Sequence, residues 1–176
     1  MNWTTLLTTE LQTAYSTTES LLDKVDPARL DWKPATGSNW MTTAQLLRHL
    51  GEACGAGCRA FLTGDWGLPP GVQMQDLKPD EILPPAGKLP AVASLEEARS
   101  LIAADRALAL EAISQAGEAT LESRLLEAPW APGTPRPLGW HFLQMCAHLE
   151  RHKAQLFYYL KLQGVPVRTE DLWGKP

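Results

Sequence analysis

Four stretches of this chain place apolar residues at helical intervals, and none alternates apolar and polar residues as a half-buried strand does. They cover about residues 3–25, 43–62, 94–117 and 134–162. Their ends carry ordinary helix stop signals, such as Gly164 at the end of the fourth stretch. The sequence therefore predicts an all-α fold in which four helices pack as a bundle.

Capping residues indicate where two of these helices begin. Thr42 is followed three residues later by Gln45, and Ser94 by Glu97, which is the spacing of a capping box. Between these two helices, residues 65–93 are rich in proline and glycine and predict a long connection. A connection of this length permits a crossover in place of simple up-and-down order.

The length of the chain and its charge narrow the class of protein. With 176 residues it is long enough for one domain and short of two full ones, so we expect a single domain over residues 1–176.

The formal net charge is −4 and the charges are dispersed, so the sequence has no basic stripe that would bind nucleic acid. No run of about twenty apolar residues predicts a membrane span. The N-terminus lacks the pattern of a signal peptide, so we expect a mature cytoplasmic protein.

The cysteines do not predict a disulfide framework. There are three of them, an odd number, and Cys54 and Cys58 lie one helical turn apart. This usage favours a reducing compartment. The spacing of Cys54 and Cys58 falls in the range of zinc ligands, but no second pair completes a site. We therefore favour the interpretation that both pack on a helix face.

Three of the four histidines fall on apolar stripes. His148 and His152 are four residues apart in the last helix and so share one face, while His49 lies near the edge of the stripe of the second helix. A buried polar group needs a partner, and three imidazoles can hold one metal ion with coordination positions left open. A core histidine bonded to a carbonyl would explain each ring separately. Spacing alone leaves metal binding and simple burial about equally open.

Two further polar residues lie on the same stripes. His141 precedes His148 by seven residues, about 10 Å along a helix, which is too far for the two to share an ion. It is either a residue at the mouth of a pocket or a structural residue, and we favour the structural interpretation. Asp105 falls within the apolar stripe of the third helix. It would either accept a hydrogen bond from a metal-bound histidine, or pair with an arginine or lie at the bundle edge. We favour the second interpretation of Asp105.

Other residues are weaker candidates. Three polar side chains lie one turn from a candidate ligand: Gln45, Glu52 and Gln155. Three of the seven tryptophans lie close to the predicted start of the second or fourth helix: Trp32, Trp40 and Trp140. They are expected either to line a cleft at one end of the bundle or to cap the core.

Two segments carry a family resemblance. LDWKPATGSNWMTTAQLLRHL and HLERHKAQLFYYLKLQGVP resemble the motifs around the second and fourth helices of the DinB/YfiT-like superfamily. The resemblance implies a bundle with a crossover connection and a divalent metal held by His49, His148 and His152. It implies nickel or zinc, or else iron or manganese, and a homodimer. Characterised relatives include S-transferases and isomerases that use bacillithiol, mycothiol or glutathione.

Three functions follow as hypotheses. The leading one is a metal-dependent thiol S-transferase that acts on a small-molecule electrophile, with the low-molecular-weight thiol as co-substrate. The second is a hydrolase in which the metal activates water, with Glu52 as the nearest carboxylate base. The third is a stress-related binding module without turnover.

Overall fold

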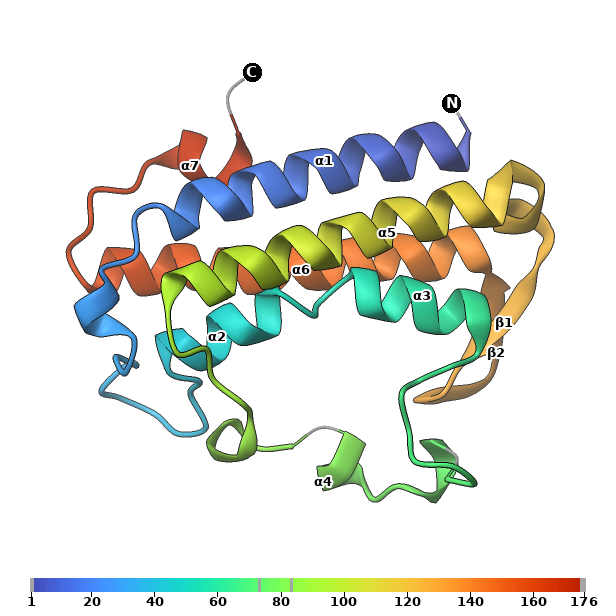
Figure 1. The fold of residues 1–176 in the computed structure, drawn as a ribbon, viewed down its shortest axis with the longest axis horizontal. Coiled ribbons are helices and arrows are strands. Elements are labelled where there is room, and N and C mark those ends of the chain that lie inside the picture. Colours follow the sequence, from blue (N-terminus) through green and yellow to red (C-terminus); the bar gives the residue numbers. More distant parts are fainter. Residues whose placement is uncertain (1, 73, 83, 175–176) are drawn as a thin grey trace.

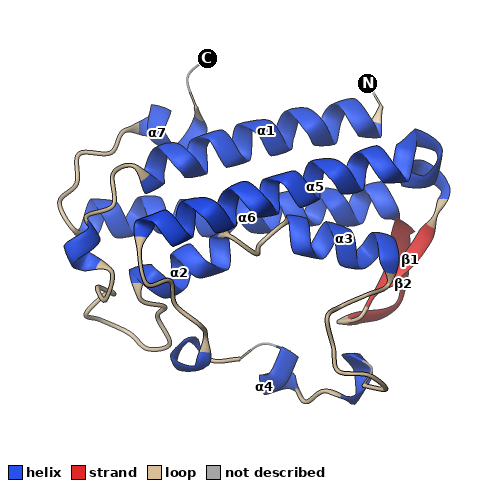
Figure 2. Cartoon of the chain, viewed as in Figure 1, coloured by secondary structure: helices blue, strands red, loops and turns tan. Residues whose placement is uncertain are grey.

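Helices dominate the computed structural model, which describes residues 2–72, 74–82 and 84–174 (Figures 1 and 2). The helices, 3₁₀ turns (η) and strands are, in chain order, α1 (Trp3–Leu22), η1 (Pro27–Arg29), α2 (Thr43–Leu50), α3 (Gly55–Thr63), η2 (Met74–Asp76), α4 (Pro79–Ile82), η3 (Ala86–Lys88), α5 (Leu95–Ser123), β1 (Leu125–Ala128), β2 (Ala131–Pro137), α6 (Leu138–Leu162) and α7 (Thr169–Trp173).

The bundle has four members: α1, the α2–α3 pair, α5 and α6. Both α1 and the α2–α3 pair pack against α5 and against α6. The α2–α3 pair and α5 run in the same direction, so the chain returns along the bundle between them (Figure 1). This return is the crossover that the long connection permitted. The predicted all-α bundle is confirmed.

Side-chain caps set the helix starts, as the sequence predicted. The hydroxyl of Thr42 accepts the N–H of Gln45, and the Gln45 side chain accepts the N–H of Thr42 in return. The hydroxyl of Ser94 accepts the N–H of Glu97 and caps α5, but the Glu97 carboxylate accepts the N–H of Ala93 and not that of Ser94, so only half of this predicted capping box forms. The amide nitrogen of Gln45 also donates to the carbonyls of Ala86 and Leu89. The end of the crossover is thereby tied to the start of α2.

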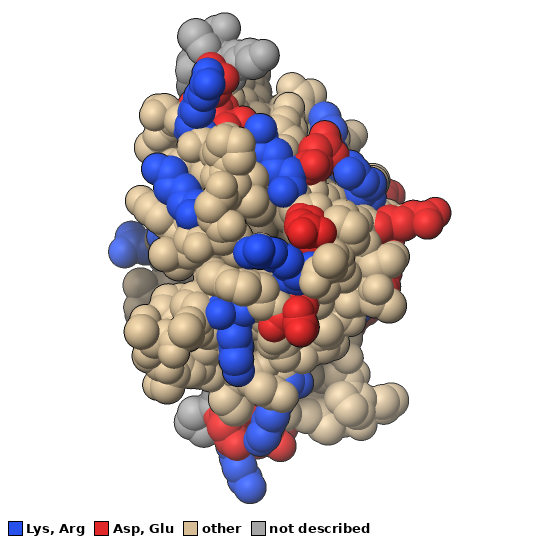
Figure 3. Space-filling model, turned by 90° about the vertical axis from the view of Figure 1, so that its left-hand side faces the viewer, with Lys and Arg blue, Asp and Glu red and all other residues tan. Residues whose placement is uncertain are grey.

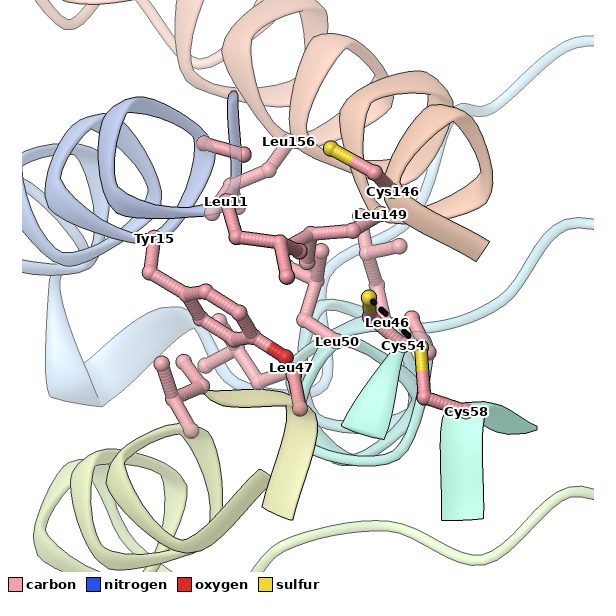
Figure 4. Close-up of a cluster of buried hydrophobic side chains, with 14 of the residues drawn as sticks. Leu11, Tyr15, Leu46, Leu47, Leu50, Cys54, Cys58, Cys146, Leu149 and Leu156 are labelled. Atoms are coloured by element: carbon pink, nitrogen blue, oxygen red, sulfur yellow. Dashed lines mark hydrogen bonds between the residues drawn. The ribbon is translucent and has the colours of Figure 1, made fainter. Parts of the chain in front are cut away.

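The core lies between the four members of the bundle. Figure 4 shows part of it, where side chains of α1, α2, α3 and α6 meet: Leu11, Tyr15, Leu46, Leu47, Leu50, Cys54, Cys58, Cys146, Leu149 and Leu156. The Sγ atoms of Cys54 and Cys58 are 4.0 Å apart, and both thiols are free and buried. The hydrogen bond with Cys58, followed by burial, raises the pKa of the Cys54 thiol. Neither cysteine joins a metal-binding group among the described residues. The interpretation that both cysteines pack in the core is confirmed, but Cys54 precedes the first turn of α3 and does not lie on a helix face.

The predicted second helix is wrong in one respect, because residues 51–54 interrupt it between α2 and α3. At this break the chain passes very close to α5. A Cβ atom on Gly51 would lie 2.6 Å from Cβ of Leu101, and one on Gly55 would lie 1.9 Å from the carbonyl oxygen of Asp105. Only glycine permits such an approach of two backbones.

The start of the predicted fourth helix is also wrong. Residues before Leu138 form strand β2, which pairs antiparallel with β1 so that Leu125 lies opposite Pro137. The amide of Leu138 donates to the carbonyl of Arg124, which places the first turn of α6 beside the hairpin. Most residues of the two strands are not buried on either face. A hairpin of this kind gives no alternation of apolar and polar residues, which is why the sequence did not predict it.

The sequence predicts that the third helix ends near Gly117, and regular helical backbone is interrupted at that residue, which has φ 67° and ψ 163°. A second helical segment follows this kink, so that α5 as a whole extends to Ser123. The kink presents the carboxylate of Glu118 to the start of α1, where it accepts the N–H groups of Trp3 and Thr4 at 2.8 and 2.9 Å. These hydrogen bonds lower the pKa of Glu118.

Smaller differences concern the ends of the connections. α1 ends at Leu22, three residues before the predicted Val25, and η1 follows it. The crossover contains η2, α4 and η3, which the sequence did not predict. Within the described residues, no helix is both long enough and apolar enough to cross a membrane. Figure 3 shows acidic and basic side chains interspersed on the end of the molecule that lies at the left in Figure 1.

Candidate metal centre

The structure brings together the three histidines that the sequence singled out. One ring nitrogen from each of His49, His148 and His152 lies within 4.8 Å of the others. The Nε2 atoms of His49 and His148 are 3.2 Å apart. All three side chains are half-buried at the contact between α2 and α6.

Two different segments supply these rings. α6 is unbroken from Leu138 to Leu162, so His148 and His152 lie one above the other on it. His49 lies in the last turn of α2, directly before the break at residues 51–54. The break therefore ends the helix at the point where its histidine faces α6.

A backbone carbonyl fixes the ring of His148. Its Nδ1 lies 2.9 Å from the carbonyl oxygen of Ala53, within the break. A carbonyl only accepts hydrogen bonds, so Nδ1 carries the proton. The Nε2 atom of the neutral ring is then left with a free lone pair directed at His49.

A chain of side chains fixes the ring of His152. Tyr159 donates its hydroxyl to the carbonyl of Met41 at 2.9 Å, and it accepts the amide of Gln155 at 3.0 Å. The amide oxygen of Gln155 must then face the Nδ1–H of His152, 3.1 Å away. The Met41 carbonyl, which can only accept, thus fixes which group donates in each of these hydrogen bonds. The Nε2 atom of His152 therefore keeps its lone pair.

The three rings are neutral at neutral pH. Burial, followed by the neighbouring charges of His152 and His148, lowers the pKa of His49 to about 4. Burial is also the largest cause that lowers the pKa of His148 and of His152. Neutral imidazole is the form that binds metal.

The residues fit a divalent ion. Zn–N bonds of about 2.0–2.1 Å place two nitrogens on one ion about 2.8–3.4 Å apart at right-angled or tetrahedral positions. The 3.2 Å between His49 and His148 lies in this range. Within the described part of the chain, no further His, Cys, Asp or Glu joins the group. Three protein ligands leave room for an exogenous one.

His141 lies outside this group. Its Nε2 donates to the carbonyl of Leu126 at 2.8 Å, and its ring stacks on Phe61 at 4.3 Å. The side chain is buried. The structural interpretation of His141 is confirmed.

Both interpretations of Asp105 are wrong. The residue is only 2% exposed, so it does not lie at the bundle edge, and it bonds no arginine or histidine in the part of the chain that the structure describes. Its carboxylate accepts the hydroxyl of Tyr15 and the backbone N–H groups of Cys54 and Ala56. Backbone donors carry no residue-type signal, so the sequence did not reveal them.

The three weaker polar candidates, Gln45, Glu52 and Gln155, differ in whether they contact a candidate metal ligand. Glu52 is exposed and pairs with Arg48, one turn before it. Gln45 is held by the α2 cap and the end of the crossover. Only Gln155 contacts a candidate ligand.

The tryptophans do not gather at one end of the bundle. Trp32 and Trp40 pack edge-on against Tyr159 at 5.2 and 6.2 Å. Trp140 packs beside His141 near the start of α6. Residues 140 and 159 are 19 positions apart on α6, or about 28 Å. The expectation of one shared cleft is therefore wrong.

An exposed cation adjoins the candidate ligands. Arg151 lies one turn after His148, so these two residues are neighbours on the surface of α6, and it directly precedes His152 in the sequence. Its charge contributes to the lowered pKa of both rings, after burial and other causes. Among the described residues, no acidic group pairs with Arg151.

Fold and site together define an all-α bundle in which three imidazoles could hold one metal ion. A model of the DinB superfamily matches residues 10–156, and the chain belongs to this superfamily. None of the functionally curated proteins compared with the chain matches it. The resemblance seen in the sequence is thereby confirmed at the level of the family.

Proposed function

We propose that this protein is a metal-dependent S-transferase that joins a low-molecular-weight thiol to a small electrophile. The observation that carries the proposal is the convergence of three neutral imidazoles with no carboxylate among them. In this proposal His49, His148 and His152 are the ligands, and nickel or zinc is the first choice of ion, because imidazole suits both.

A divalent ion held by these rings supplies a positive charge that favours the thiolate over the thiol at neutral pH. The thiolate sulfur forms a bond to the electrophilic carbon, and the bond from that carbon to its leaving group breaks. The thiol proton passes to water. The protein's own residues orient the ligands: the Ala53 carbonyl holds His148, and Gln155 holds His152.

Arg151 supports a thiol that carries a carboxylate. Arg151 is an exposed guanidinium beside His148 and pairs with no acidic group among the described residues, so it attracts an anion by charge and by its planar set of donors. The co-substrate that fits a site beside Arg151 is therefore an anionic thiol.

A hydrolase is less well supported, because Glu52, its candidate base, already pairs with Arg48.

Metal analysis of the purified protein tests the centre. We expect about one divalent ion per chain, lost in His148→Ala. Glu52→Gln is the matched control and should keep the ion. Undiminished metal content in His148→Ala would remove the centre from the proposal.

Turnover is tested with the metal-loaded protein. An anionic thiol should raise its melting temperature and should be conjugated to a generic electrophile only when metal is present. Glu52→Gln should retain this conjugation. Ester hydrolysis that needs Glu52, with no effect of any thiol, would instead favour the hydrolase.

A further inference from the structure

Asp105 is a buried carboxylate to which the described residues offer no cationic partner. Its Oδ2 accepts the hydroxyl of Tyr15 at 2.8 Å and the N–H of Cys54 at 3.1 Å, and its Oδ1 accepts the N–H of Ala56 at 2.9 Å. Two of these three donors belong to the start of α3. A carboxylate this deeply buried is stable only where such donors are arranged around it.

The start of α3 depends on this carboxylate. Cys54 is the N-cap residue of α3, and its own side chain makes no capping hydrogen bond. The first N–H groups of a helix lack partners within the helix, and they attract negative charge. Asp105 therefore caps α3 from a different helix, and the missing Cβ of Gly55 lets α5 come close enough to do so.

The same peptide group also serves the candidate metal centre. The N–H that Oδ2 accepts belongs to Cys54, and the carbonyl that His148 bonds belongs to Ala53. These two groups form one peptide bond, which is planar and, in this structure, trans. Its N–H and C=O point in opposite directions. One rigid unit therefore connects the carboxylate of α5 to the imidazole of α6.

We propose that Asp105 is a positioning residue that orients and polarises His148 through the Ala53–Cys54 peptide group. Metal-binding histidines commonly donate directly to a carboxylate, which fixes the ring and makes it a stronger ligand. Here a peptide group stands between the two. Hydrogen bonds in series strengthen one another, so the charge of Asp105 makes the Ala53 oxygen a better acceptor for the Nδ1–H of His148. The inference rests on the proposed metal centre.

His152 provides an internal comparison. It donates to the neutral amide of Gln155, and its supporting chain ends at the carbonyl of Met41. Asp105 takes no part in that chain. A change at Asp105 should therefore affect His148 and leave the ring of His152 as it was.

Long-range ¹H–¹⁵N NMR of the imidazoles, recorded on metal-free protein, tests the proposal. Asp105→Asn offers one acceptor oxygen in place of two and adds a donor. We expect His148 to become a mixture of tautomers while His152 keeps its proton on Nδ1. In a separate zinc competition titration, the affinity of Asp105→Asn should fall by about 10- to 100-fold.

Tyr15→Phe is the matched control, because it removes one donor to Asp105 and leaves both backbone donors in place. It should preserve the tautomer of His148. An unchanged tautomer and zinc affinity in Asp105→Asn would overturn the proposal, and so would an equal effect of Tyr15→Phe.

Should Asp105→Asn fail to fold, the wild-type protein supplies a second measurement. Scalar couplings across hydrogen bonds should connect the Cys54 amide to Cγ of Asp105, and Nδ1 of His148 to the carbonyl carbon of Ala53. The absence of either coupling would refute the connection. Both NMR readouts use metal-free protein, so their failure is distinguishable from a failure of metal binding or of turnover.

Discussion

The two sides of the candidate metal centre are built differently. α6 is one continuous helix that carries two of the histidines. Gln155 and Tyr159, whose side chains hold the ring of His152 in place, lie on the same helix. The opposite side is the interrupted α2–α3 pair, where His49 ends one helix and the Ala53 carbonyl lies in the break. Its support comes from α5, about fifty positions later in the chain. One side is set by helix geometry and the other by tertiary packing.

The largest effect is expected where the break meets α5. A Cβ on Gly55 would lie 1.9 Å from the backbone oxygen of Asp105, so Gly55→Ala forces two backbones apart. We expect a loss of about 3 kcal/mol in the free energy of unfolding, measured by urea denaturation. Gly87→Ala is the control, because a Cβ added there would meet no atom of a non-adjacent described residue within 4 Å. Equal stability of the two variants would show that the break does not need close contact with α5.

The second-largest effect is expected from a substitution on the α6 side of the candidate metal centre. Gln155→Leu removes the acceptor of His152 without touching the break. Zinc affinity should fall by about 10- to 100-fold in a competition titration, because partners of this kind orient the ligand. Gln144→Leu, on the same helix and without a hydrogen bond from its side chain to the described residues, should bind zinc as the wild type does. A loss shared by both variants would mean that α6 itself is disturbed.

A fall in pH should lower the free energy of unfolding of the metal-free protein through the histidine rings, and most strongly through His49. The folded ring stays neutral down to its pKa of about 4, whereas the ring in the unfolded chain takes up a proton below about pH 6.5. The unfolded state therefore binds more protons in this window, and the stability of metal-free protein falls as the pH drops from about 6.5 to about 4. We expect a smaller change than that from Gly55→Ala, because the ring is partly exposed to solvent.

Denaturation at a series of pH values measures the slope of the free energy of unfolding against pH. His49→Gln should make it shallower, while the lowered pKa values of His148 and His152 leave part of it in place. A slope identical to that of the wild type would show that His49 does not titrate as its burial requires.

The smallest effect should come from Arg151, which lies on the exposed surface of α6. Arg151→Gln removes one solvent-exposed charge, which is worth about 0.2–1 kcal/mol in an ion pair. The preference for a carboxylate-bearing thiol over a neutral one, measured as a ratio of kcat/KM, should fall by about twofold to fivefold. An unaltered ratio would separate Arg151 from thiol recognition.

The sequence predicted the parts that depend on neighbours along the chain. Helical periodicity indicated all four members of the bundle, and the spacing of His148 and His152 placed them on one face. The capping pair of Thr42 and Gln45 was confirmed bond by bond. Each of these features depends on residue types within a few positions of one another.

The parts that the sequence missed depend on distant backbone. The break at residues 51–54 lies where Gly51 and Gly55 let the backbone of α5 approach closely, and helical periodicity alone does not show where the helix stops. Asp105 was misread because two of its three partners are backbone N–H groups, which every residue except proline possesses. The β1–β2 hairpin was missed because neither of its faces is buried enough to impose a pattern.

α5 supplies a carboxylate to the start of two other helices: Asp105 to α3 and Glu118 to α1. Until α5 docks, the first turns of both helices lack these acceptors and are free to fray. The bundle should therefore assemble and come apart as one cooperative unit. A fragment without α5 would leave the first turn of α3 without a side-chain cap and that of α1 with the cap from Asn2 alone.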